Sequence, residues 1–155
     1  MKSNKSLAAL VLMFIGLAVF AHGTTVAAQA AVEAAPKAQL KVTIDKIKNA
    51  KGHILISVFS DNGAYYKDTD HAAAVLKLTP AQAREFIVTD LAPGNYAIAI
   101  FHDENDNGKL DTFAGIPREG YSFSNSSGIM PPAWEQAAFQ VKAPTTTFAL
   151  HMRYL

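Results

Sequence analysis

The 155-residue chain contains no cysteine. Disulfides, thiolate metal sites and thiol catalysis are therefore excluded. Stability has to come from the hydrophobic core, with a bound metal as a candidate supplement. The chain also has no excess of one charge, because its 14 Lys and Arg residues nearly balance its 13 Asp and Glu residues. A near-neutral chain without a basic cluster argues against binding to nucleic acid or to anionic membrane surfaces.

No apolar run is long enough to span a bilayer. The longest, Leu7 to Phe20, falls short of the ~20 residues that a membrane-spanning helix needs. It follows Lys2 and Lys5 and is followed by small residues, which is the pattern of an export signal peptide. The triplet Ala28-Gln29-Ala30 fits cleavage before Ala31, and Val26-Ala27-Ala28 is a second candidate site.

These features predict a signal peptide over residues 1–30, a flexible lead over 31–38 and one domain over 39–155. We expect the mature protein in the periplasm or outside the cell, without a transmembrane anchor. Beyond position 30 there are twelve basic and thirteen acidic residues, which gives a formal charge of −1. This length is enough for one hydrophobic core but not for two.

Helical periodicity is missing, and alternation with a period of two dominates. Leu40, Val42 and Ile44 alternate with polar residues, and a turn at 49–52 leads into the next apolar run, so the first two strands are expected to form a hairpin. The sequence predicts an all-β protein, a single antiparallel sandwich of immunoglobulin-like or transthyretin-like type with about seven strands and one long ordered loop. The expected strands are 40–44, 53–59, 74–78, 86–88, 96–100, 138–141 and 147–154.

Residues 91–96, Leu-Ala-Pro-Gly-Asn-Tyr, form a corner that leads into a strand. This arrangement is typical of the tyrosine corner of β-sandwiches, in which the Tyr hydroxyl bonds back to the backbone. An ordinary Pro-Gly turn is the alternative. In the strand that follows, the bulky residues should face the core, and Ala97 and Ala99 should lie under another segment.

Residues 103–136 show little alternation and are rich in Gly, Asn, Ser and Pro. A segment of this length is uncommon in a compact domain unless it is functional or disordered. We expect an ordered flap over the sandwich because the segment carries several apolar side chains that have reason to pack. They are Phe113, Ile116, Tyr121, Phe123, Ile129, Met130 and Trp134.

The most informative motif is the run 101–111, Phe-His-Asp-Glu-Asn-Asp-Asn-Gly-Lys-Leu-Asp, at the end of an expected strand. Its oxygen donors have the spacing of a loop that wraps Ca²⁺, with a glycine at the sixth position for the sharp bend. The expected ligands are Asp103, Asn105, Asn107, the backbone carbonyl of Lys109, and Asp111. The position where an EF-hand has its bidentate Glu is Ala114, so this is not an EF-hand. The alternative is a turn whose Asp and Asn side chains bond to their own backbone.

Two further residues are candidate accessories to this loop. Glu119 is expected to supply a carboxylate from the flap, and His102 immediately precedes the loop and has a candidate supporting role. Glu104 and Asp106 are expected to point outward. Calcium is the expected cofactor, with the modest affinity of extracellular sites, roughly 10⁻⁴ to 10⁻³ M.

Tyr121 and Trp134 are a candidate platform for a ligand, with Tyr65 and Tyr66 as further ring residues in turn regions. An alternative function is therefore binding of carbohydrate or another small ligand of the cell envelope, with an envelope glycan or protein as partner. The other possibility is that these rings pin the flap to the core.

Sequence motifs of catalysis are absent. There is no Gly-x-Ser-x-Gly elbow, no paired-histidine zinc spacing and no phosphate-binding glycine loop. We expect a protein that is not an enzyme, and a hydrolase is the least favoured hypothesis.

The corner, the loop and the later run from Gly115 to Asn125, Gly-Ile-Pro-Arg-Glu-Gly-Tyr-Ser-Phe-Ser-Asn, together resemble an exported bacterial family called domain of unknown function 2141. The resemblance extends from Leu40 to Tyr154. It implies an exported all-β domain and no particular activity. More distantly, the corner and strand are similar to those of transthyretin-like sandwiches. The hydrolases of that type end in Tyr-Arg-Gly-Ser, whereas this chain ends in His-Met-Arg-Tyr-Leu, so their activity is not implied.

Overall fold

The computed structural model describes residues 36–61 and 63–155, so the expected signal peptide over 1–30 lies outside the described residues, as does most of the lead. Ten strands are present in the described part: β1 (Ala38–Asp45), β2 (His53–Phe59), β3 (Ala74–Leu78), β4 (Glu85–Leu91), β5 (Gly94–Asp103), β6 (Thr112–Phe113), β7 (Ile116–Pro117), β8 (Gly120–Phe123), β9 (Phe139–Val141) and β10 (Thr145–His151). The helices are two short 3₁₀ turns, Thr69–His71 and Gln82–Arg84, and the single-turn α1 (Trp134–Ala137).

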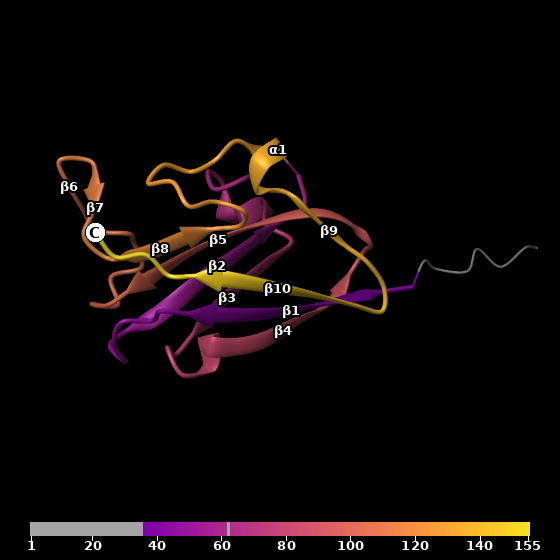
Figure 1. Cartoon of the computed structure of the whole chain (residues 1–155), viewed down its shortest axis with the longest axis horizontal. Helices are drawn as coiled ribbons and strands as arrows, with labels where there is room; N and C mark the ends of the chain where they lie inside the picture. The colour runs from indigo at the N-terminus through magenta and orange to yellow at the C-terminus, as the bar shows by residue number, and fades with distance from the viewer. Residues whose placement is uncertain (1–35, 62) are drawn as a thin grey trace, which may run out of the picture. The chain divides into compact units, whose positions relative to one another are not determined.

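Two main sheets form the domain (Figure 1). One has the order β10-β1-β4, and the other has the order β3-β2-β5-β8 with β9 also paired to β5. The predicted all-β sandwich is confirmed. One pair is parallel, because β1 runs alongside β10 in the same direction. The predicted hairpin of the first two strands is wrong, since β1 and β2 belong to different sheets and residues 46–52 cross between them.

The core fills the space between the two sheets. Leu40, Val42 and Ile44 of β1 belong to one hydrophobic cluster with Ile98 and Ile100 of β5, and all are nearly inaccessible to solvent. Alternation along each strand produces this layer, because successive side chains point to opposite faces. Burying one such aliphatic side chain contributes about 1.5–3 kcal/mol, so the core is the main source of stability in a chain without disulfides.

A second apolar cluster covers the outer face of β2 and β5. Phe59 and Ala97 on the sheet pack against Ala64, Tyr65 and the α1 region. The prediction that the alanines of β5 lie under another segment is therefore correct. Ala97 is fully buried and Ala99 packs at the edge of the cluster, where small side chains let the covering segment come close.

The tyrosine corner is confirmed. Tyr96 is buried, and its hydroxyl donates a 2.8 Å hydrogen bond to the carbonyl of Ala92. Burial raises the pKa of Tyr96, and the hydrogen bond to Ala92 opposes this shift. The corner fixes the direction in which β5 enters its sheet, and β5 carries the candidate site at its far end.

The flap contains the β6–β7 hairpin, β8 and α1 (Figure 1). The prediction that its apolar side chains pack is wrong for four of them, because Phe113, Ile116, Ile129 and Met130 are exposed. They lie in the β6–β7 hairpin and in the coil before α1. Tyr121 is buried because β8 joins the sheet beside β5.

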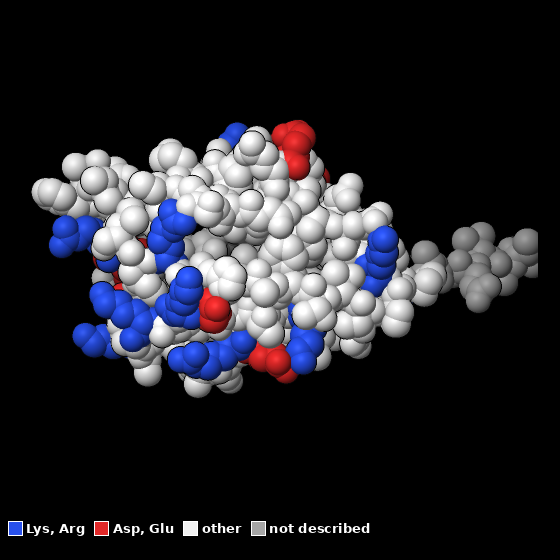
Figure 2. All heavy atoms as spheres, in the orientation of Figure 1, with Lys and Arg blue, Asp and Glu red and all other residues white. Residues whose placement is uncertain are grey.

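No helix among the described residues is long and apolar enough to cross a membrane. Figure 2 shows Lys and Arg side chains gathered near the end of the domain where β1 and β10 finish, with acidic side chains among them.

Candidate functional site

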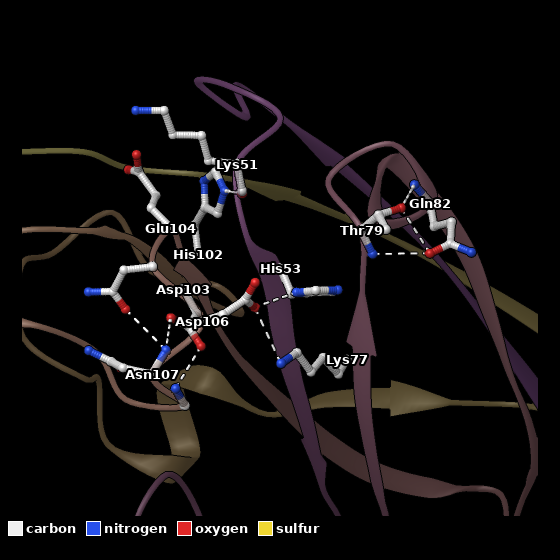
Figure 3. Close-up of polar contacts among 12 residues, drawn as sticks. Lys51, His53, Lys77, Thr79, Gln82, His102, Asp103, Glu104, Asp106 and Asn107 are labelled. Atoms are coloured by element: carbon white, nitrogen blue, oxygen red, sulfur yellow. Dashed lines mark hydrogen bonds and ion pairs between the residues drawn. The ribbon is translucent and has the colours of Figure 1, made fainter.

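Asp103 holds the base of the Asp/Asn-rich loop. It is the last residue of β5 and is fully buried. Its two carboxylate oxygens accept hydrogen bonds from the backbone N–H groups of Asn107 (3.0 Å) and Gly108 (2.8 Å). Hydrogen bonds to a charged acceptor are stronger than neutral ones, so this carboxylate folds the chain back on itself directly after the strand (Figure 3).

The other predicted side-chain ligands join Asp103 in one network. Asn105 and Asn107 donate from their amide nitrogens to the two oxygens of Asp111, at 2.7 and 2.9 Å. Their amide oxygens accept from the backbone N–H groups of Asn107 (3.1 Å) and Lys109 (2.8 Å). The structure therefore brings the four side chains together, while the Lys109 side chain is exposed.

Glu119 closes the loop. Its carboxylate is buried and accepts from the backbone N–H of Glu104 through one oxygen and of Asp111 through the other, both at 2.9 Å. The β6–β7 hairpin returns the chain so that Glu119, 15 and 8 residues away from these partners, bridges the two ends of the loop. The structure thus places Glu119 at the loop, with both oxygens engaged by backbone donors.

His102 supports the loop from the core side. It is fully buried, and its Nε2 lies 2.7 Å from the carbonyl oxygen of Lys51. A carbonyl only accepts, so Nε2 carries the proton and Nδ1 accepts from the Tyr154 hydroxyl at 2.7 Å. The Tyr154 oxygen in turn accepts from the Lys48 N–H at 3.1 Å. This chain of bonds joins the C-terminal segment, the 46–52 crossing and β5. Burial raises the pKa of Tyr154, which keeps its hydroxyl protonated for donation.

The acidic residues expected to point outward anchor the loop to its surroundings. Asp106 pairs with His53 on β2 and with Lys77 on β3, the latter at 3.3 Å (Figure 3). Glu104 accepts from the Asn49 side chain at 2.9 Å. Sequence reasoning missed these contacts, because they depend on the register that sets His53 opposite Asp103. No local pattern gives that register.

The Asp106 anchor predicts a pH dependence. The hydrogen bond from His53 lowers the pKa of Asp106, with Lys77 adding to the effect. The ionised carboxylate therefore stabilises the fold above its unfolded pKa of about 3.9 and loses this contribution as pH falls through the folded value. We expect Asp106→Asn to lower the thermal midpoint slightly at pH 7, and the difference from the wild type to shrink as the pH falls through the lowered pKa of Asp106. Melting curves across this range test it, with the exposed Asp70→Asn as control; an equally large difference at low pH would contradict it.

The two residues of the predicted ligand platform occupy separate positions. Tyr121 is buried on β8, and Trp134 is half-buried on α1 with its ring 5.8 Å from that of Tyr65. They line two neighbouring pockets that share Tyr66 and Pro131. Trp134 therefore packs on the Tyr65 ring, which is part of the cluster under the flap.

The donor chemistry of the loop suits one kind of metal. Among the described residues, no three side chains of His, Cys, Asp or Glu lie close enough together to hold an ion. A cation here would need the amide oxygens of Asn105 and Asn107 and a backbone carbonyl in addition to the Asp carboxylates. An all-oxygen set with few charges fits Ca²⁺ and does not fit Zn²⁺.

Together, the sheets and this loop define an all-β sandwich domain with a polar Asp/Asn loop closed by a buried glutamate. The chain belongs to the family described as "Uncharacterized protein conserved in bacteria (DUF2141)", whose model matches residues 42–149. The match covers the sandwich from β1 into β10 and includes the whole loop. No curated protein and no solved structure matches the chain.

Proposed function

We propose that this protein is an exported, non-enzymatic β-sandwich module whose 103–111 loop binds one Ca²⁺ ion that orders the end of the domain. The observation that carries this proposal is the convergence of Asn105 and Asn107 on the Asp111 carboxylate, with Asp103 bonded to the same backbone segment. Each engaged amide or carboxylate oxygen keeps a further lone pair that can face a cation.

A cation would replace the two side-chain amides that now donate hydrogen bonds to the Asp111 carboxylate. The side chains of Asn105 and Asn107 would shift so that the free lone pair of each amide oxygen faces the ion beside the Asp111 oxygens, and these amide oxygens would keep their backbone hydrogen bonds. Asp103 and Glu119 would keep their backbone bonds and hold the loop ends in place. The protein would contribute positioning and charge, and the ion would link the strand end to the flap.

The proposal that the protein is not an enzyme is supported by the surroundings of the histidine–carboxylate pairs among the described residues. His53, His71 and His151 pair with Asp106, Asp68 and Asp45, all at exposed or half-exposed positions. None of these pairs is hydrogen-bonded to a serine or threonine hydroxyl in the described part of the chain, so the geometry offers no activated nucleophile.

Calcium is expected to raise the thermal midpoint of unfolding. Binding to the folded state alone adds RT ln(1 + [Ca²⁺]/Kd), which is about 1.4 kcal/mol at ten times Kd. For a domain of this size that corresponds to a rise of roughly 5 °C. Melting curves in 10 mM calcium and in chelator measure it. Magnesium at the same concentration is the control, because it fits an all-protein oxygen cage poorly. Equal midpoints in calcium and in chelator would contradict the proposal.

A further inference from the structure

A pocket separate from the proposed calcium ligands lies on the outer face of the sheet β2-β5-β8. It has a volume of about 280 Å³. Its floor is built by Ser57, Ala99 and Phe101, which the strand register places on the same outward-facing side. Two of these three side chains are small, so the sheet surface is hollowed at this point.

The walls of the pocket are aromatic. Tyr121 and Phe123 of β8 stand side by side with ring centroids 6.0 Å apart and an interplanar angle of 61°. Tyr66, from the segment that covers the second apolar cluster, meets Phe123 edge to face at 6.5 Å. Leu110 and Pro131 complete the rim. Aromatic pairs prefer offset-stacked or edge-to-face contacts, so a further ring can pack against these walls.

The pocket contains a polar group without a partner. The Tyr121 side chain is 2% exposed, and its hydroxyl has no hydrogen-bond partner among the described residues. Buried hydroxyls in native proteins nearly always have one. The Tyr65 hydroxyl is likewise buried without a partner, but Tyr65 does not line this pocket, whereas the hydroxyls of Tyr96 and of the half-buried Tyr154 are both bonded. An unsatisfied group in a pocket wall is where a ligand atom would be expected.

We propose that this pocket binds a small uncharged aromatic compound whose oxygen or nitrogen pairs with the Tyr121 hydroxyl. None of the described side chains that line the pocket is charged, which disfavours an ionic ligand. The volume is near the lower end of the ~300–1,000 Å³ range of ligand pockets, so one or two rings fit. A sugar fits less well, because the polar groups of the described lining side chains are four hydroxyls, too few for the many polar groups of a sugar. They belong to Ser57, Tyr66, Thr69 and Tyr121.

This site is independent of calcium binding, apart from Leu110, which lies between Lys109 and Asp111 and reaches the rim. The test therefore uses a chelator, so that failure of the calcium proposal and failure of this one can be told apart. The probe is N-phenyl-1-naphthylamine, a neutral two-ring amine whose fluorescence rises in apolar surroundings. Quenching of Trp134, the one tryptophan of the chain, gives a second readout from the neighbouring pocket.

We expect saturable probe binding by the wild type. Ala99→Leu should abolish it by filling the floor, and should lower the thermal midpoint somewhat because the covering segment packs against Ala99. Tyr121→Phe should weaken binding by roughly three- to tenfold, the effect of one hydrogen bond. Its thermal midpoint should stay the same or rise, because the change removes an unpaired buried hydroxyl. A merely structural tyrosine would instead lose stability when altered.

Tyr154→Phe is the matched control. It also removes one hydroxyl, but one that bonds to His102 and Lys48, so it should lower the thermal midpoint and leave the probe affinity unchanged. Absence of saturable binding by the wild type would overturn the proposal. So would full binding by a folded Ala99→Leu variant, or displacement of the probe by simple sugars and not by neutral phenols.

Discussion

Gly52→Ala is expected to destabilise the protein by more than about 3 kcal/mol and to disturb the loop at the end of β5. A Cβ atom at this position would lie 1.8 Å from the backbone oxygen of Asp103 and within 2.9 Å of the carbonyl carbon of Glu104. These are backbone atoms, so no side-chain rotation relieves the clash. Gly52 also has φ +55°, which alanine adopts at a cost of about 1 kcal/mol.

The variant Gly108→Ala separates the cost of the steric clash from the cost of the positive φ. Gly108 has φ +76°, but a Cβ atom there would meet nothing within 4 Å. This variant should therefore lose only the conformational term, about 1 kcal/mol. Urea unfolding of the two variants beside the wild type measures the difference. Similar losses in both would mean that the β1–β2 crossing moves aside easily and that its contact with Asp103 is not tight.

Asp103→Ala is expected to have the second large effect, about 3 kcal/mol of lost stability even in chelator. The change removes the buried, charged acceptor of two backbone N–H groups, those of Asn107 and Gly108. For a domain of this size the thermal midpoint should fall by roughly 10 °C. The variant should also lose the rise produced by calcium, because the residue is one of the proposed ligands.

The variant Asp111→Ala, measured beside Asp103→Ala, separates calcium binding from the structural role of the Asp103 carboxylate. Asp111 is half-buried and accepts from two side-chain amides that water can satisfy. Its loss should cost little stability in chelator and should still remove the effect of calcium. A calcium-induced rise that survives in Asp111→Ala would place the ion elsewhere. An unchanged midpoint for Asp103→Ala in chelator would contradict the structural role of its carboxylate.

Local features of this fold were predictable from sequence. The Tyr96 corner joins residues four positions apart, and its bond to Ala92 depends only on the short Pro-Gly-Asn segment between them. The strand positions follow from alternation, and the small residues Ala97 and Ala99 indicated a covering segment. The gathering of Asp103, Asn105, Asn107 and Asp111 also follows from their spacing, because each bonds within a few residues along the chain.

Contacts between strands or side chains that are far apart in the sequence were not predictable. The parallel neighbour of β1 is β10, about a hundred residues later, and neither strand carries a local indication of it. The hairpin prediction failed for the same reason, since residues 46–52 cross between sheets although they contain ordinary turn residues. The contact of Asp106 with His53 likewise requires the β2–β5 register. Exposure of Phe113 and Met130 contradicts the general expectation that apolar side chains pack, and composition alone gives no indication of it.

The most direct test of calcium binding is a calcium titration monitored by two-dimensional NMR spectra of the ¹⁵N-labelled protein. With calcium added to 10 mM, the side-chain amide signals of Asn105 and Asn107 and the backbone signal of Gly108 should shift saturably. The fitted Kd should be roughly 10⁻⁴ to 10⁻³ M, and magnesium should produce no comparable shift. Signals that stay in place, or drift linearly and equally with both ions, would contradict a calcium site in this loop.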